Sequence, residues 1–81
     1  MHPAEVWDLL HAGDWAAAHG DGEALQGVAR LLAMRLDGGY RGAARAVAAL
    51  APLNLETASL LWGRLAATLR AEAHNEAPAE S

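Results

Sequence analysis

The sequence of 81 residues contains no cysteine, no phenylalanine, no isoleucine and no lysine. Without cysteine there is no disulfide framework, no thiolate metal site and no cysteine nucleophile, which argues against a small secreted scaffold and favours a reducing cytoplasm. Uncharged apolar runs of membrane-spanning length are also missing, and the first residues lack the basic and apolar regions of a signal peptide. We therefore expect a soluble, full-length, cytoplasmic protein that does not bind membranes.

Alanine and leucine dominate what is present, with 21 and 13 copies. Both residues favour helices, while the β-branched and aromatic residues that favour strands are scarce, so the composition predicts an all-α fold. The larger apolar side chains are few, and a chain of this length lies near the lower limit for a stable single core. The core is therefore expected to be thin, and packing against a partner chain would enlarge it.

The charges are unevenly distributed along the chain, which has a net charge of −4. Residues 1–24 contain five acidic residues and no arginine, whereas residues 25–70 contain all six arginines and two acidic residues. The arginines fall on three different predicted helices, with no aromatic residue interleaved, and this pattern does not favour binding of nucleic acid. We expect instead that the arginines pair with the acidic N-terminal segment, within the chain or across a dimer.

The N-terminal part of the chain is expected to form two short helical segments. Pro3 suits the first turn of a helix, and an apolar face follows until Gly13 ends the run. Asp14 then caps a second segment, residues 15–19, by accepting hydrogen bonds from backbone N–H groups. The sequence Gly20-Asp21-Gly22 breaks this segment after little more than one turn.

Three longer helices are predicted in the remainder of the chain. The first begins at Asp21 or Gly22, and a turn at residues 37–39 separates it from the second. Pro52 ends the second helix, and Asn54 caps the third. The apolar stripes expected to face the core are Leu25, Val28, Ala29, Leu32 and Leu36 in the first helix; Tyr40, Ala43, Ala44, Val47 and Leu50 in the second; and Ala58, Leu61, Trp62, Leu65 and Leu69 in the third.

Together these segments predict one compact bundle of four to five short helices with antiparallel neighbours, over residues 1–71. Residues 72–81 contain no large apolar residue and predict a disordered acidic tail. Gly27, Gly42 and Gly63 lie within predicted helices, where each costs about 1 kcal/mol relative to alanine. We expect that close approach of neighbouring helix backbones offsets this cost.

The most distinctive string is Gly13-Asp14-Trp15-Ala16-Ala17-Ala18-His19, followed by Leu25-Gln26-Gly27-Val28. Together with the runs 42–45 and 50–52, it resembles a bacterial and archaeal family of small helical proteins, domain of unknown function 309, over roughly residues 9–55. If that family builds a site from histidine and carboxylates, this chain retains His19, with Asp14 or Asp21 as substitutes for the acids. The resemblance then implies a lapsed or altered site, because Ala17 stands where the family has an acid. The run 13–18 also resembles part of a tetratricopeptide repeat.

The residues of this string allow more than one interpretation. Imidazole and carboxylates can bind a divalent metal, but paired ligand spacing is missing, so a structural His19 is favoured. Gln26 either holds His19 through a side-chain hydrogen bond or faces water. Trp15 is the best interface candidate, because its short segment buries it poorly. No hydroxyl lies in a recognisable nucleophile motif, and we expect no enzymatic activity, no metal and no cofactor.

Two hypotheses about function follow from these patterns. The first is a non-catalytic helical module that binds a protein partner or associates with itself, as a homodimer or a larger homo-oligomer. The second is a small-ligand or metal-binding protein whose binding residues are Asp14, Trp15, His19 and Gln26.

Overall fold

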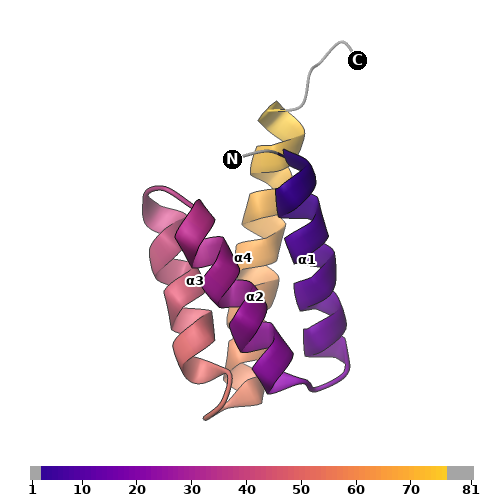
Figure 1. Cartoon of the computed structure of the whole chain (residues 1–81), viewed down its shortest axis with the longest axis vertical. Helices are drawn as coiled ribbons and strands as arrows, with labels where there is room; N and C mark the ends of the chain where they lie inside the picture. The colour runs from indigo at the N-terminus through magenta and orange to yellow at the C-terminus, as the bar shows by residue number, and fades with distance from the viewer. Residues whose placement is uncertain (1–2, 77–81) are drawn as a thin grey trace.

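Residues 3–76 fold into four helices arranged as one up-and-down bundle (Figure 1). The structure is a computed structural model, and it describes residues 3–76. The helices are α1 (Pro3–Ala18), α2 (Gly22–Arg35), α3 (Gly39–Leu50) and α4 (Leu55–Glu76). Each helix packs against the next one in the sequence and α4 packs back against α1, which places α1 and α3 at diagonal corners. The predicted all-α bundle is confirmed.

The core lies between the four helices and consists mainly of alanine, valine and leucine. All five residues of the predicted α2 stripe are buried. In α4 the predicted stripe is buried apart from the half-buried Leu61, and Trp62 is the largest side chain of the core, with 2% of its surface exposed. The core is thus built from small side chains around one large aromatic ring. Within residues 3–76, no helix has both the length and the apolar character needed to cross a membrane.

Local signals in the connections position the helices as the sequence predicts. Asp21 caps α2, because its carboxylate accepts a hydrogen bond from the backbone N–H of Ala24 at 3.0 Å. Asn54 caps α4 in the same way, through the N–H of Thr57 at 3.0 Å. Between α2 and α3, Gly38 has a φ of 79°, a left-handed conformation that favours glycine.

The predicted break near Gly13 is wrong, because α1 is one continuous helix from Pro3 to Ala18. Gly13 is buried, and a Cβ atom added to it would overlap the six-membered ring of the Trp62 indole. The glycine therefore provides a flat contact surface for Trp62 and does not end the helix. The chain turns away from α1 only at Gly20, which has a φ of 68°. A tertiary contact outweighs the low helix propensity of glycine at position 13.

The last helix is longer than predicted. It continues past Ala71, where the sequence suggested the start of a disordered tail, to Glu76. Alanine favours helices, and Ala73 in this extension is buried. The remainder of the predicted tail, residues 77–81, lies outside the described residues.

The three glycines expected to allow close helix contacts do not make such contacts. Gly27, Gly42 and Gly63 are exposed, and no atom of a neighbouring helix lies within 4 Å of the position that a Cβ atom would occupy. That expectation is wrong because the faces of α2, α3 and α4 that carry these glycines point to solvent. The close approach is made instead by Gly13.

Gly13→Ala is expected to lower the free energy of unfolding by about 1–3 kcal/mol, the usual cost of overpacking a core. The added methyl group would meet the buried Trp62 ring. The matched substitution Gly27→Ala, at an exposed helical position without neighbours, is expected to raise the free energy of unfolding by up to about 1 kcal/mol. Urea denaturation measures both changes. Equal effects of the two substitutions would contradict the role assigned to Gly13.

Candidate functional site

Asp14 joins α1 to α4 through two hydrogen bonds. Its Oδ1 accepts from Nε1 of Trp62 at 3.0 Å, and its Oδ2 accepts from Nη2 of Arg70, with which it also forms an ion pair. The Trp62 ring is buried, and the bond to Oδ1 gives its indole N–H the hydrogen-bond acceptor that a buried polar group needs. The predicted role of Asp14 as a helix cap is wrong, because the residue lies inside α1 and its carboxylate bonds to α4.

Trp15 and His19 form a stacked pair on the outside of α1. Their ring centroids are 4.2 Å apart, with 18° between the ring planes. Nδ1 of His19 donates a hydrogen bond to the carbonyl oxygen of Trp15 at 2.8 Å. The same carbonyl oxygen also accepts a hydrogen bond from the backbone N–H of His19 at 3.0 Å, so the imidazole shares an acceptor that already has a backbone partner. Both residues are exposed, Trp15 to 55%, so an indole held by its neighbour projects from the surface.

The four residues expected to form a binding site do not converge. Asp14 bonds to α4, whereas Trp15 and His19 stack on the exposed side of α1. Gln26 is half-buried on α2, and no hydrogen bond joins it to His19. Asp21, the other candidate carboxylate, is occupied as the cap of α2. In the described part of the chain, no group of three or more histidine, aspartate or glutamate residues is placed to hold a metal ion.

Some arginines pair with the acidic N-terminal segment, as the charge pattern predicts. Arg70 pairs with Asp14, and Nε of Arg35 lies 3.9 Å from Oε1 of Glu5. Arg41 has a different role, because its Nε donates to two carbonyl oxygens near the end of α2 at 3.1 and 3.2 Å. These contacts link neighbouring helices. The side chains of Arg35, Arg41 and Arg70 therefore have partners within the bundle.

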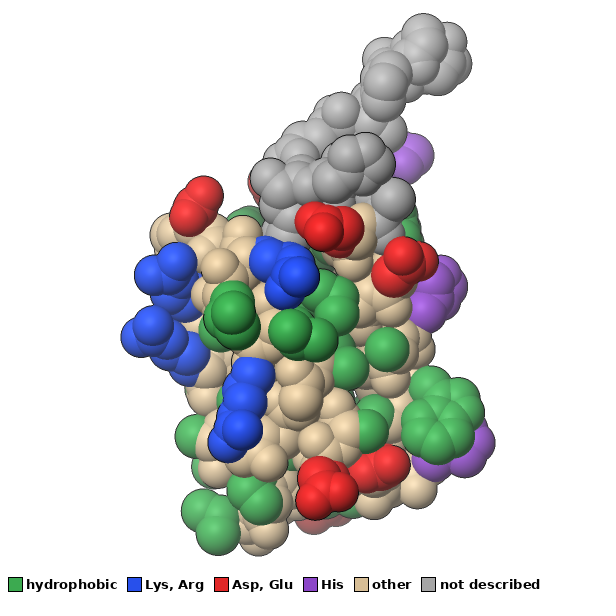
Figure 2. All heavy atoms as spheres, in the orientation of Figure 1, with side chains coloured by type: hydrophobic (Ala, Val, Ile, Leu, Met, Phe, Trp, Pro, Cys, Tyr) green, Lys and Arg blue, Asp and Glu red, His purple; other side chains and the backbone are tan. Residues whose placement is uncertain are grey.

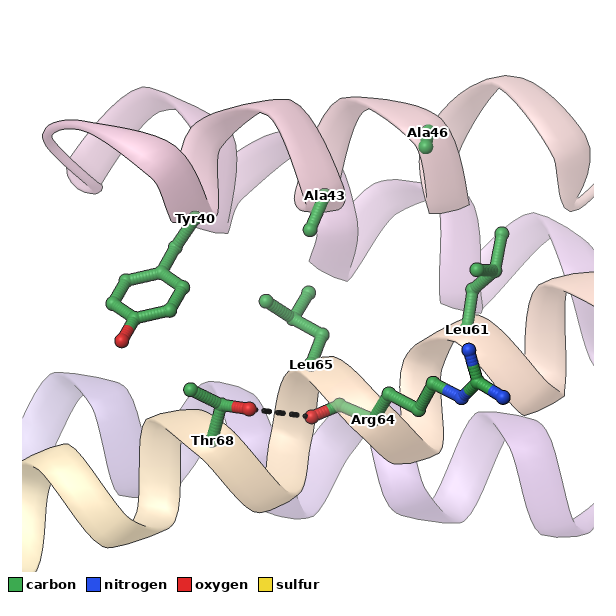
Figure 3. Close-up of a pocket in the computed structure, with 7 residues that line it drawn as sticks. All are labelled: Tyr40, Ala43, Ala46, Leu61, Arg64, Leu65 and Thr68. Carbon is green, nitrogen blue, oxygen red and sulfur yellow. Dashed lines mark hydrogen bonds between the residues drawn. The ribbon is translucent and has the colours of Figure 1, made fainter.

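Sequence reasoning missed a shallow groove of about 310 Å³ between α3 and α4 (Figure 3). It is hollow because alanine at positions 43 and 46 leaves space opposite Leu61 and Leu65, whose side chains point toward α3. Ala43 was expected to face the core but is exposed, because the buried face of α3 is formed by Ala44, Val47 and Ala48. In the sequence, the signal for this groove was the pair Ala43 and Ala46, two small side chains on one face of the helix. The full lining is Tyr40, Ala43, Ala46, Leu61, Arg64, Leu65 and Thr68.

The groove offers an apolar surface with one cation at its edge. The hydroxyl of Thr68 donates to the carbonyl oxygen of Arg64 at 3.0 Å, so this polar group is already satisfied (Figure 3). Among the lining residues, the guanidinium of Arg64 carries the charge. Leu60, one turn before Arg64 on α4 and outside the lining, is exposed to 68%. Such a surface can hold an apolar side chain of a partner. The guanidinium of Arg64 can attract an acidic residue of the partner that lies next to that side chain.

Asp14→Ala is expected to lower the free energy of unfolding by about 1–3 kcal/mol, because Nε1 of the buried Trp62 loses its acceptor and Arg70 loses its partner. The ion pair is partly exposed, which favours the lower half of that range. His19→Ala removes a hydrogen bond at the surface and is expected to cost less than about 1 kcal/mol. Urea denaturation compares the two variants. If His19→Ala were the more destabilising substitution, the assignment of Asp14 as the link between α1 and α4 would be contradicted.

The chain was compared with family models, with curated proteins and with solved structures. None of the three comparisons finds a match. The resemblance of the string from Gly13 to His19 to a known family therefore stays a prediction. The site with the clearest physical basis for binding is the groove between α3 and α4.

Proposed function

We propose that this protein is a non-catalytic helical module that binds another protein chain in the groove between α3 and α4. The observation that carries the proposal is an apolar hollow open to solvent, lined by Leu61, Leu65 and two alanines. Burial of apolar surface is the main driving force of protein association, and pockets that accept a large side chain are frequent energetic centres of interfaces.

The polar groups of the groove support binding in preference to catalysis. The Thr68 hydroxyl is engaged with a backbone carbonyl, and the lining contains no carboxylate or imidazole to serve as its base. Arg64 at the edge favours a partner with acidic residues around an apolar anchor. The expected partner segment is therefore an amphipathic helix or a projecting apolar side chain with acidic neighbours.

Selection from a displayed library of amphipathic helical peptides tests this function directly. The probe variant is Ala46→Arg, which places a long side chain in the groove. The matched control is Ala49→Arg, on the same helix, exposed and outside the lining. Selected peptides are expected to bind the wild-type and Ala49→Arg proteins equally, and to bind Ala46→Arg at least about tenfold more weakly, a change of about 1.4 kcal/mol. Circular dichroism verifies that both variants are folded.

Two results would speak against the proposed function. One is a library that yields no peptide with affinity above that of unselected sequences. The other is a set of peptides that bind all three proteins alike, which would place their binding surface outside the groove.

A further inference from the structure

We infer that the occupant of the groove is the exposed face of α1 from a second copy of this chain, with Trp15 as the side chain that enters. This inference rests on the proposed function and names the partner. It joins two surface features of the bundle that the fold itself leaves unexplained: an indole exposed to 55%, and a hollow that no side chain of residues 3–76 fills.

Trp15 has the properties of an interface anchor. It is the largest exposed apolar side chain among the described residues, and tryptophan is the residue most enriched at energetic centres of interfaces. The stacked ring of His19 and its hydrogen bond to the Trp15 carbonyl limit the conformations available to the indole. Binding therefore loses little conformational entropy at this side chain.

The volume of the groove leaves room for one aromatic side chain. Its volume of about 310 Å³ lies at the lower end of the range of ligand pockets, roughly 300–1,000 Å³. Leu61 and Leu65 provide apolar contacts for the ring. The guanidinium of Arg64 at the edge can lie over the face of an indole, an arrangement in which a cation is attracted by the aromatic ring.

The charges of the two surfaces are complementary. Of the acidic residues of α1, Glu5 and Asp14 pair with Arg35 and Arg70 of the same molecule, whereas the exposed Asp8 lies two turns before Trp15 on the same side of the helix. In the groove, Arg64 carries the positive charge, and the lining includes no acidic residue. Figure 2 shows the face that α2 covers, with arginine side chains over it and toward the side of α3 and histidine side chains along the opposite edge. A second copy whose Trp15 enters the groove can therefore bring the Asp8 carboxylate toward the Arg64 guanidinium.

The same charges argue against a symmetric dimer in which two grooves face each other. That arrangement would bring Arg64 of one copy close to Arg64 of the other, and like charges across an interface are unfavourable. Because α1 and α3 occupy diagonal corners of the bundle, the Trp15 face and the groove point in different directions. The contact is thus head-to-tail, and each added copy leaves one Trp15 and one groove available for further growth or ring closure.

Sedimentation velocity of single variants and of their mixture tests this inference. Trp15→Ala keeps the groove but lacks the anchor, whereas Ala46→Arg keeps the anchor but has a blocked groove. Each variant alone is expected to raise the Kd of self-association at least about tenfold. Mixed together, the two variants are expected to form a complex of one copy of each, because Trp15 of the second variant can still enter the groove of the first. That complex cannot grow further.

The matched controls are Met34→Ala, which removes another exposed apolar side chain, and Ala49→Arg, which adds the same charge outside the groove. Both are expected to associate as the wild type does. If Ala46→Arg abolishes association while Trp15→Ala does not, the inference about Trp15 is overturned and the binding function of the groove stands. A wild type that stays monomeric, or a mixture without the mixed complex, also overturns the inference. Peptide selection still decides the proposed function in either case.

Discussion

The contact between Trp62 and the surface of α1 is the interaction on which the rest of the structure depends. The indole of Trp62 lies against Gly13, where a single added carbon would overlap it, and its Nε1 donates to Asp14, the next residue. Arg70, two turns further along α4, bonds to the same carboxylate. One ring and one carboxylate thus hold the first helix against the last. This contact closes a bundle whose other core residues are mostly small.

The same contact determines what α1 shows to solvent. Because Asp14 is directed at α4, the following residue, about 100° further around the helix, is turned away from the bundle. Trp15 is therefore exposed, and its stack with His19 forms outside the core. On the other side of the molecule, alanine residues of α3 leave the groove against α4. A core with few large side chains produces both features, an aromatic ring that the fold does not bury and a hollow that it does not fill.

Local signals in the sequence predicted the parts of the fold that depend on nearby residues. Asp21 and Asn54 cap their helices by bonding to N–H groups three residues away, and the α2 stripe follows from helical spacing alone. The same reasoning failed at Gly13 and Asp14, which locally resemble a helix end followed by a cap. Their partner Trp62 lies 48 residues beyond Asp14, and no neighbouring residue indicates the contact. The groove was missed for a similar reason, since it arises from how α3 is rotated against α4.

The most direct test of this account is a double-mutant cycle between Gly13→Ala and Trp62→Phe, measured by urea denaturation. The phenyl ring is shorter than the indole and leaves room for the added methyl group, so the two sites should be coupled. We expect Gly13→Ala to cost at least about 1 kcal/mol less in the Trp62→Phe background than in the wild type, within the range seen for residues in contact. Additive effects, equal within about 0.5 kcal/mol, would contradict the claim that Trp62 packing on Gly13 organises the bundle.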